Sequence, residues 1–367
     1  MAQVLSSREL NRATLARQLL LRREKRPAAA AVEHLVGLQA QEPGDPYVAL
    51  WTRLEGFDPE ELSRLLAERR AVRTALMRAT IHLVTARDCL AFRPLFDPVL
   101  ARVFGGTPFA KNADGVDLPA LLAEARALMD ERPRTRGELG RLLAESRPGR
   151  DPNSLSHAVG YLMPGVQVPP RGLWGRTGQA TWATTESWLG PKKRRPATPA
   201  DTILRYLAAF GPASVSDART WSGLTGLRAI FEELRPRLVT FRAESGTELF
   251  DLPDAPRPPS DTPAPVRFLP QYDNVLLGYA DRSRFVAAGA RQPLFSQDGR
   301  AYGLVLVDGH VRSRWKLVRH KTEAHLVLES ARPLARNEAG EVDDEASRLL
   351  AFLAPGTPPA IEHVGRA

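Results

Sequence analysis

The chain has little cysteine, little lysine and no long apolar run. Its single cysteine, Cys89, excludes an internal disulfide and suits a reducing compartment. No stretch approaches the roughly 18 uncharged apolar residues of a membrane span. The N-terminal run MAQVLSSREL has no apolar signal core. We therefore expect no secretion, no membrane partner and a cytoplasmic location.

The usual sequence signatures of catalysis and of metal or cofactor binding are also missing. We find no Gly-rich phosphate loop, no HExxH pair, no CxxC pair and no nucleophile elbow. His320 and His325 lie among β-like residues at a spacing that is poor for two ligands of one metal ion. No lysine has the apolar flanks that a Schiff base needs. The sequence accordingly predicts no metal and no cofactor.

Positive charge is abundant, and arginine carries most of it. The 51 Lys and Arg residues outnumber 42 Asp and Glu residues and give a formal net charge of +9. Lysine occurs only at positions 25, 111, 192, 193, 316 and 321. Such a balance favours a polyanion partner. The skew toward Arg, Ala and Pro equally fits a GC-rich genome, so charge alone leaves nucleic-acid binding open.

The same order of helical and strand-like patterns recurs three times. Ser6 and Glu9 have capping-box spacing at the first helix, and Asp58-Pro59 and Asp151-Pro152 each open a later one. Each pass ends in a hairpin-like stretch, at 72–84, 173–185 and 238–252. Three helices followed by a hairpin are typical of a winged helix. Three passes in the same order favour tandem winged helices over an unrelated mixed fold.

Segments without periodicity separate these passes at 105–117, 189–200 and 253–265, and the last has six prolines in thirteen residues. Beyond it the sequence is β-rich and suggests a small barrel or sandwich with a closing helix at 342–353. We predict an α+β chain with three winged helices followed by a β-barrel domain. The expected boundaries are 1–104, 118–190, 197–252 and 266–367.

The clearest hairpin, at 302–318, turns at Asp308-Gly309, where both positions favour positive φ. Alternation along its second strand puts His310, Arg312, Arg314 and Lys316 on one face. Such a row suits contact with DNA phosphates or a groove, although it also suits the solvated face of a barrel. The other candidate DNA contacts are Arg73, Arg78, Arg176, Arg282 and Arg284.

A glutamine pair stands out within residues 34–51, HLVGLQAQEPGDPYVALW. Gln39 and Gln41 end an apolar helical pattern just before Pro43, which disfavours helix at the preceding residue. In extended backbone, residues i and i+2 point the same way, so two amides can converge on one small target. From the spacing alone, ordinary polar residues at a helix end are the better explanation.

Longer runs resemble the winged-helix DNA glycosylase family that includes the azinomycin-resistance (AlkZ-type) crosslink glycosylases. These runs are TLARQLLLR, HLVGLQAQEPGDPYVALWTRL, LMRATIHLVTARD, RYLAAFGPAS, FLPQYDNVLLGYADRSRF and VLVDGHVRSRWK. In that family a glutamine–apolar–glutamine motif is catalytic, and residues 39–41 match it position by position. A sister branch carries Gln-x-Asp, so the second glutamine points to the crosslink-unhooking type. The family fold wraps tandem winged helices around a C-shaped DNA channel and adds a β-barrel with a DNA-probing hairpin, which we map onto 302–318.

The resemblance implies a monofunctional glycosylase that hydrolyses the N-glycosidic bond of N7-alkylguanine and unhooks interstrand crosslinks, for DNA repair or azinomycin-type self-resistance. Its partner would be double-stranded DNA carrying alkylated or crosslinked purines, bound by a monomer. A glutamine amide does not titrate near neutrality. Since the alkylated base already carries positive charge, Gln39 and Gln41 are left to position water and stabilise an oxocarbenium-like transition state.

Two interpretations from other classes stay open. The chain can be a non-catalytic winged-helix transcriptional regulator, which would bind one DNA sequence tightly and be indifferent to damage. It can also be a single-strand-binding or architectural protein, which would show no turnover and little preference for a lesion.

Overall fold

A computed structural model describes residues 3–191, 194–286, 294–296, 299, 301–320, 323–358 and 360–365. Helices and strands are mixed along the chain, and the described strands form three sheets. The predicted α+β class is thus confirmed. No helix in these ranges is long and apolar enough to cross a membrane.

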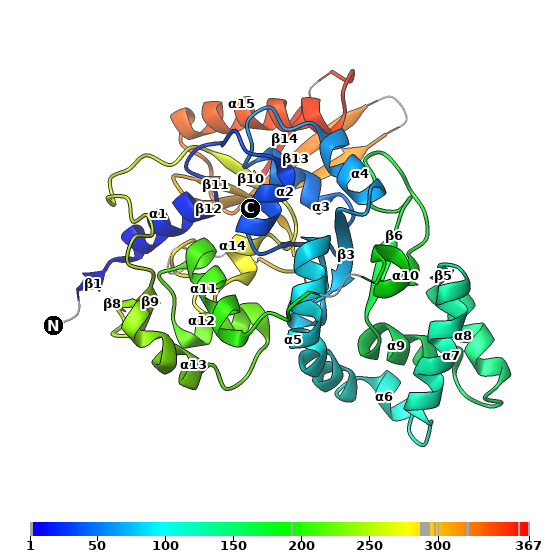
Figure 1. Ribbon diagram of the computed structural model, residues 1–367. Coiled ribbons are helices and arrows are strands. Elements are labelled where there is room, and N and C mark those ends of the chain that lie inside the picture. The colour runs from blue at the N-terminus through cyan, green and yellow to red at the C-terminus, as the bar shows by residue number, and fades with distance from the viewer. Residues whose placement is uncertain are drawn as a thin grey trace.

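The first third of the chain, blue to cyan in Figure 1, ends in the long helix α5. Its elements are β1 (Val4–Leu5), α1 (Ser7–Arg17), α2 (Ala28–His34), β2 (Leu38–Gln39), α3 (Asp45–Trp51), α4 (Pro59–Ala67), β3 (Ala71–Ala75), η1 (Met77–Ala79), β4 (Ile81–Thr85) and α5 (Ala86–Gly105). The predicted capping box at Ser6 and Glu9 is present at α1, and the Asp58 side chain caps α4 as expected.

The middle of the chain forms two further groups of elements. The first comprises α6 (Pro108–Asn112), α7 (Leu118–Glu131), β5 (Arg134–Thr135), α8 (Arg136–Glu145), α9 (Pro152–Leu162), β6 (Gly165–Val168), β7 (Thr181–Thr184) and α10 (Thr185–Leu189). The second comprises α11 (Pro199–Phe210), α12 (Val215–Ser222), α13 (Leu227–Leu234), η2 (Arg235–Arg237), β8 (Val239–Ala243) and β9 (Glu248–Asp251).

One order of elements recurs in three units, which we call the first (28–85), second (118–184) and third (199–251). Each has a helix, a short strand, two helices and two antiparallel strands, and the short strand pairs with the last strand of its unit. In the third unit the short strand is reduced to one bridge between Ala213 and Phe250.

The predicted hairpins are found in the first and third units, but the one at 173–185 is wrong. Only its end is a strand, β7, whose partner is β6 on the other side of a long loop. The positive φ of Gly172 and Gly175 keeps this loop out of strand geometry.

The first and second units share one sheet. Its strand order is β2-β4-β3-β6-β7-β5, and β3 pairs with β6 through Arg73 opposite Gln167 and Thr74 opposite Val166. The sheet therefore runs without interruption from the end of β2, where Gln39 lies, to the second unit.

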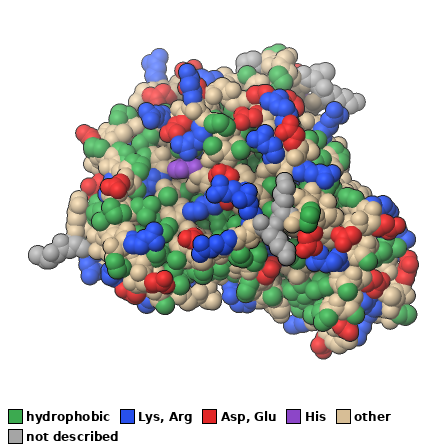
Figure 2. Space-filling view, in the orientation of Figure 1, with side chains coloured by type: hydrophobic (Ala, Val, Ile, Leu, Met, Phe, Trp, Pro, Cys, Tyr) green, Lys and Arg blue, Asp and Glu red, His purple; other side chains and the backbone are tan. Residues whose placement is uncertain are grey.

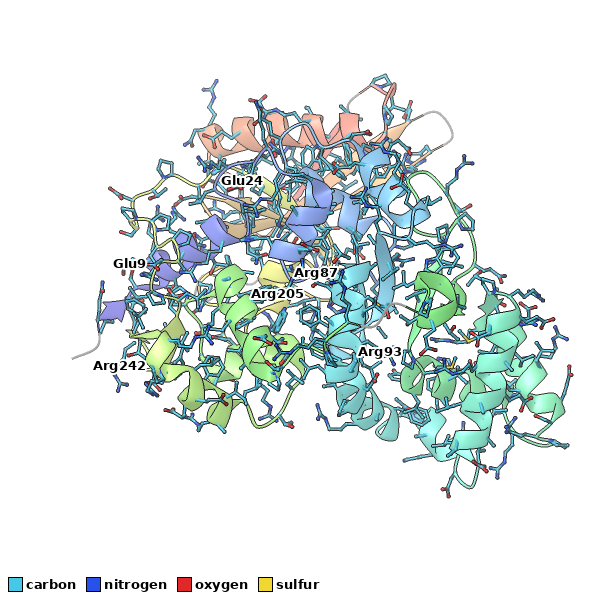
Figure 3. The ribbon with its side chains drawn as sticks, viewed as in Figure 1. Glu9, Glu24, Arg87, Arg93, Arg205 and Arg242 are labelled. Carbon is cyan, nitrogen blue, oxygen red and sulfur yellow. The ribbon has the colours of Figure 1, made fainter. Side chains whose placement is uncertain are left out.

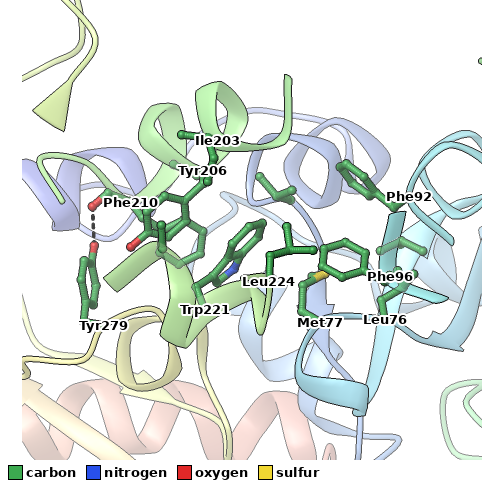
Figure 4. Packing of buried hydrophobic residues seen from close by; sticks show 14 of the residues in the cluster. Leu76, Met77, Phe92, Phe96, Ile203, Tyr206, Phe210, Trp221, Leu224 and Tyr279 are labelled. Carbon is green, nitrogen blue, oxygen red and sulfur yellow. Dashed lines mark hydrogen bonds between the residues drawn. The ribbon is translucent and has the colours of Figure 1, made fainter. Parts of the chain in front are cut away.

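The third unit is joined to the first through a common core. Figure 4 shows Met77 of η1 and Phe96 of α5 lying toward Tyr206 and Trp221 of the third unit. At the edge of this core, Arg205 of α11, labelled in Figure 3, forms a bidentate ion pair with the buried Asp88 at the start of α5, with both contacts at 2.7 Å. These contacts hold η1 firmly against α12.

The C-terminal region forms an open five-stranded sheet, not the predicted barrel. Its elements are β10 (Arg267–Leu269), α14 (Asn274–Leu277), β11 (Gly303–Val307), β12 (His310–Arg319), β13 (Ala324–Ser330), α15 (Arg336–Leu353) and β14 (Ala360–Gly365). Among the described strands, β10 and β14 are the two edges. The sheet does not need to close on itself, because α15 packs Val342, Ala346 and Leu349 against its apolar residues.

Candidate active site

Gln39 is a buried glutamine whose amide is held by a charged donor. It ends β2, pairs with His82 of β4, and is 6% exposed. Its Oε1 accepts a hydrogen bond from Nη2 of Arg78 at 2.8 Å. Because the backbone is fixed by the sheet and the amide by a guanidinium, the orientation of this side chain is set before any ligand binds.

Arg78 also joins Gln39 to two further groups. Its Nη1 donates to the backbone carbonyl of Trp221 on α12, and its Nη2 lies 3.3 Å from Nε2 of His82. His82 Nδ1 is 2.9 Å from the carbonyl of Thr80, so Nδ1 carries the proton and Nε2 accepts. Burial lowers the pKa of His82 to about 3 and that of Arg78 to about 10. At neutral pH the imidazole is therefore neutral and the guanidinium is charged.

Gln41 lies two residues on and has different surroundings. It is exposed, and its Oε1 accepts from the backbone N–H of Ile81 at 3.4 Å. The intervening Ala40 donates its own N–H to the Ile81 carbonyl at 2.7 Å. Both glutamines thus contact the segment 78–81, one from inside the protein and one at its surface.

Unusual backbone conformations surround this motif. Val36, Arg78 and Ala79 have φ values of 56°, 55° and 57°, in the left-handed region that disfavours side chains with a Cβ. Such strain persists only where surrounding contacts enforce it, and it is concentrated at functional sites. The side-chain amide of Asn274, at the start of α14, donates to the carbonyl of Gly37 at 3.0 Å and so helps to enforce it here.

A small cavity of about 360 Å³ opens beside Gln41. It lies between the first and second units, and its lining residues are Gln41, Ala75, Ala79, Ile81, Phe109, Arg136, His157, Gly160, Tyr161, Gln167, Ala180 and Trp182. Gln39 is not among them. The two glutamines therefore differ in access, since only the second reaches the space where a ligand fits.

A larger cleft of about 980 Å³ lies on the other side of the segment 42–45. It is bounded by the loop before β7 and by the C-terminal sheet, and it presents the cationic side chains Arg176, Lys316 and Arg319. Asp45 also lines it, and burial, followed by the nearby Glu42, raises the pKa of Asp45 well above its ordinary value. The motif thus stands between a small polar cavity and a wide cleft with positive side chains.

Three of the arginines predicted to contact DNA are buried. Arg73, Arg284 and Arg314 are 2%, 4% and 2% exposed, so their guanidinium groups are not on the surface. Arg73 Nη2 donates instead to the carbonyl of Ala40 at 2.7 Å, which supports the backbone between the two glutamines. Arg284 Nη1 bonds Thr14 Oγ1, and its guanidinium lies over the ring of Tyr279.

The predicted row of cations on β12 is interrupted, and three of its members are paired with acidic side chains. Arg312 pairs with Glu338, and Arg314 and Lys316 both pair with Glu329. The alternation is interrupted by a register shift opposite Val305 and Leu306, which buries Ser313 and Arg314 together.

The turn of this hairpin has the predicted conformation, with positive φ at Asp308 and Gly309. Its tip does not project, because Asp308 pairs with Arg8 and Arg12 of α1, and Asn11 donates to the Gly309 carbonyl at 2.7 Å. His310 Nδ1 bonds the Asp308 carbonyl. The turn is therefore a docked part of the core structure rather than a free probe.

The remaining predicted cations are more accessible. Arg176 is exposed, and the side chains of Lys316 and Arg312 are 59% and 39% exposed. Arg282 is partly buried and donates to the carbonyl of Leu276. Figure 2 shows Lys and Arg side chains spread over the visible face with acidic side chains between them, so no single basic patch dominates that face.

Sequence reasoning missed the wall of the small cavity. Arg136, His157, Gln167 and Trp182 come from α8, α9, β6 and β7 of the second unit, far from Gln41 in the chain. No local spacing signals this group, because it is assembled by the pairing of β3 with β6.

Comparisons with known proteins agree with one another. A family model described as "DNA glycosylase AlkZ-like" matches residues 32–352. A curated protein of Streptomyces sahachiroi named "Interstrand DNA cross-link repair glycosylase" is 27% identical over 327 residues, which covers 82% of this chain and 85% of that protein. The solved structure of Streptomyces sahachiroi DNA glycosylase AlkZ is similar with a TM-score of 0.79 at 22% identity, and the match covers 99% of this chain and 100% of that one.

Proposed function

Because this chain belongs to the AlkZ-like DNA glycosylase family, we propose that it hydrolyses the N-glycosidic bond of N7-alkylguanine in duplex DNA, including guanines joined in interstrand crosslinks. The relative's name supports the crosslink as a substrate, since that protein is named as an interstrand crosslink repair glycosylase. The enzyme acts as a monomer and leaves an abasic site. The biological roles that fit are DNA repair and self-resistance to azinomycin-type alkylators.

The observation that carries the proposal is the contrast between the two glutamines. Gln39 is buried and fixed by Arg78, while Gln41 is exposed beside a cavity. An amide is neutral at all working pH values, so neither side chain is a strong acid or base. Gln41 can place a water molecule and direct its amide oxygen at developing positive charge, while Gln39 holds the motif in position.

The chemical step is a hydrolysis that needs no protonation of the leaving group. The C1′–N9 bond breaks and its electron pair neutralises the cationic N7-alkylguanine, while the sugar passes through an oxocarbenium-like transition state. The oxygen of water bonds to C1′ and its proton is lost to solvent. Gln41, at the surface, holds the water, and Gln39, fixed by Arg78, keeps the motif in position.

DNA binding follows from the arrangement of the three units. We interpret them as winged helices around a C-shaped channel, because each repeats the order of a winged helix. The exposed cations Arg176 and Lys316 contact phosphates from the walls of the larger cleft. Arg73 and Arg78 act on the motif rather than on DNA.

The test is a single-turnover assay with two duplexes, one holding an N7-methylguanine and one an N7-linked interstrand crosslink. Samples are resolved with and without hot alkali. We expect base release from both substrates and strand cleavage only after alkali. Nicking without alkali would contradict the monofunctional assignment. No release at saturating protein, with sequence-specific binding, would favour a winged-helix regulator instead.

A further inference from the structure

The small cavity beside Gln41 has a polar atom, Oε1 of Gln167, that no described residue satisfies. Gln167 is 9% exposed, and its Oε1 is enclosed and accepts no hydrogen bond among the described residues. Arg136 has no carboxylate partner in the described ranges; its Nη1 donates only to Nε2 of His157 at 3.0 Å. A buried amide oxygen without a partner is costly in an empty site, and the half-buried guanidinium of Arg136 has no carboxylate to neutralise it among the described residues, so together they point to a polar ligand.

Aromatic side chains supply the rest of the wall. The rings of Phe109 and His157 are stacked with centroids 3.6 Å apart and planes at 16°. Trp182 lies beneath the guanidinium of Arg136, with 5.9 Å between the Arg136 Cζ and the ring centroid. Burial lowers the pKa of His157, and its Nδ1 bonds the Asn153 carbonyl, so its ring is neutral and held in place. Rigid aromatic walls favour a flat, unsaturated ligand.

From these observations we propose that the cavity receives an everted guanine base, so that an N7-alkylguanine carried by one strand leaves the helix before its bond is broken. The proposal rests on the proposed function. The edge of guanine offers the O6 acceptor to Arg136 and N–H donors to the Gln167 oxygen. Adenine has a donor where guanine has O6 and an acceptor where guanine has N1–H, so it does not match these two side chains. With the base in the cavity, Gln41 stands at its entrance, beside the bond to be hydrolysed.

The size of the cavity agrees with this ligand. Its volume of about 360 Å³ falls in the range of roughly 300–1,000 Å³ of small-molecule sites. A guanine tethered to the opposite strand cannot leave the helix, because its crosslink restrains it. Crosslinks are therefore unhooked without eversion, and the cavity serves lesions on one strand.

This difference between substrates separates a binding role from a structural one. Gln167→Ala removes the unpartnered amide, and Ala180→Phe fills the cavity from the loop before β7 without removing a polar group. Gln179→Ala is the matched control, since Gln179 is an exposed glutamine of the same loop that does not line the cavity. We expect Gln167→Ala to excise N7-methylguanine about tenfold more slowly, the loss of one hydrogen bond in a buried site. Ala180→Phe should lose at least as much because it fills the space of the base, and unhooking of crosslinks should be unchanged in both.

Eversion is measured directly with a duplex that holds a hydrolysis-resistant 2′-fluoroarabino N7-methylguanine next to 2-aminopurine. Binding of the wild-type protein should raise 2-aminopurine fluorescence; the rise should be smaller with Gln167→Ala and absent with Ala180→Phe, while anisotropy shows that both variants still bind. No rise with the wild-type protein overturns the inference, as do equal losses on both substrates. Excision of N7-methylguanine without a fluorescence rise leaves the glycosylase function standing, whereas no excision of any substrate refutes both.

Discussion

Replacing Arg78 with methionine should slow base release without removing either glutamine. Methionine keeps the length and apolar stem of the side chain but cannot donate to Gln39 Oε1, which accepts from Arg78 at 2.8 Å. The Gln39 amide then rotates among several orientations. The bond to the Trp221 carbonyl is lost as well, so stability has to be measured separately.

The size of the effect follows from the charge of the donor. A hydrogen bond to a charged group contributes about 1.5–3 kcal/mol, and each 1.4 kcal/mol of barrier is tenfold in rate. If the orientation of Gln39 is needed in the transition state, the single-turnover rate on N7-methylguanine falls roughly 10- to 100-fold. The affinity for undamaged duplex should stay within about twofold.

The matched control is Arg102→Met. Arg102 also donates to a backbone carbonyl next to α12, that of Gly223, but it contacts no glutamine. Because Arg102 is exposed, we expect this variant to lose less stability than Arg78→Met and to retain its rate. A wild-type rate in a folded Arg78→Met protein would refute the role of the oriented Gln39 amide.

Four other perturbations test the framework of the site. Asp273→Asn should lower the unfolding free energy by about 3–5 kcal/mol in chemical denaturation, because Asp273 makes a fully buried bidentate ion pair with Arg53. Burial lowers the pKa of His82 from 6.5 to about 3, so the unfolded state takes up a proton more readily than the folded state. The unfolding free energy should therefore be highest above pH 6.5 and about 2 kcal/mol lower at pH 5. A series of melting curves should show this loss for the wild-type protein and not for His82→Gln. Burial raises the pKa of Asp45, so folding favours the protonated carboxyl and the contribution of Asp45 to the unfolding free energy is lost as pH rises. The melting temperature of Asp45→Asn should therefore exceed that of the wild-type protein at pH 8 but not near pH 4. Arg176→Ala should reduce the slope of log K against log salt for undamaged duplex by about 1, and an unchanged slope would remove Arg176 from the DNA contacts.

Local chemistry in the sequence predicted much of the framework. The side chains of Asp58 and Asp151 cap helices where the Asp-Pro pairs predict them, and Asp308-Gly309 turns with positive φ. These features depend on residues a few positions apart, so a single sequence is enough to reveal them. The repeated order of elements follows from the same signals.

What the sequence could not predict depends on contacts between distant segments. Arg73 lies in a strand that pairs with both β4 and β6, so it is buried and supports Ala40. Arg314 is buried because a register shift interrupts the alternation of β12. The open C-terminal sheet reflects the coverage by α15, which strand patterns alone do not contain. The cavity beside Gln41 needs the first and second units to meet.

The central claim is that the motif of Gln39 and Gln41 is needed for the hydrolysis, with Gln41 holding the water and Gln39 supporting it, and the double variant Gln39→Ala, Gln41→Ala tests it most directly. Its single-turnover release of N7-methylguanine is compared with that of wild type and of Gln3→Ala, Gln179→Ala, which removes two exposed glutamines away from the motif. We predict that the motif variant binds the lesion duplex normally and loses all alkali-dependent cleavage, while the control keeps it. Cleavage at the wild-type rate in the motif variant would contradict the account.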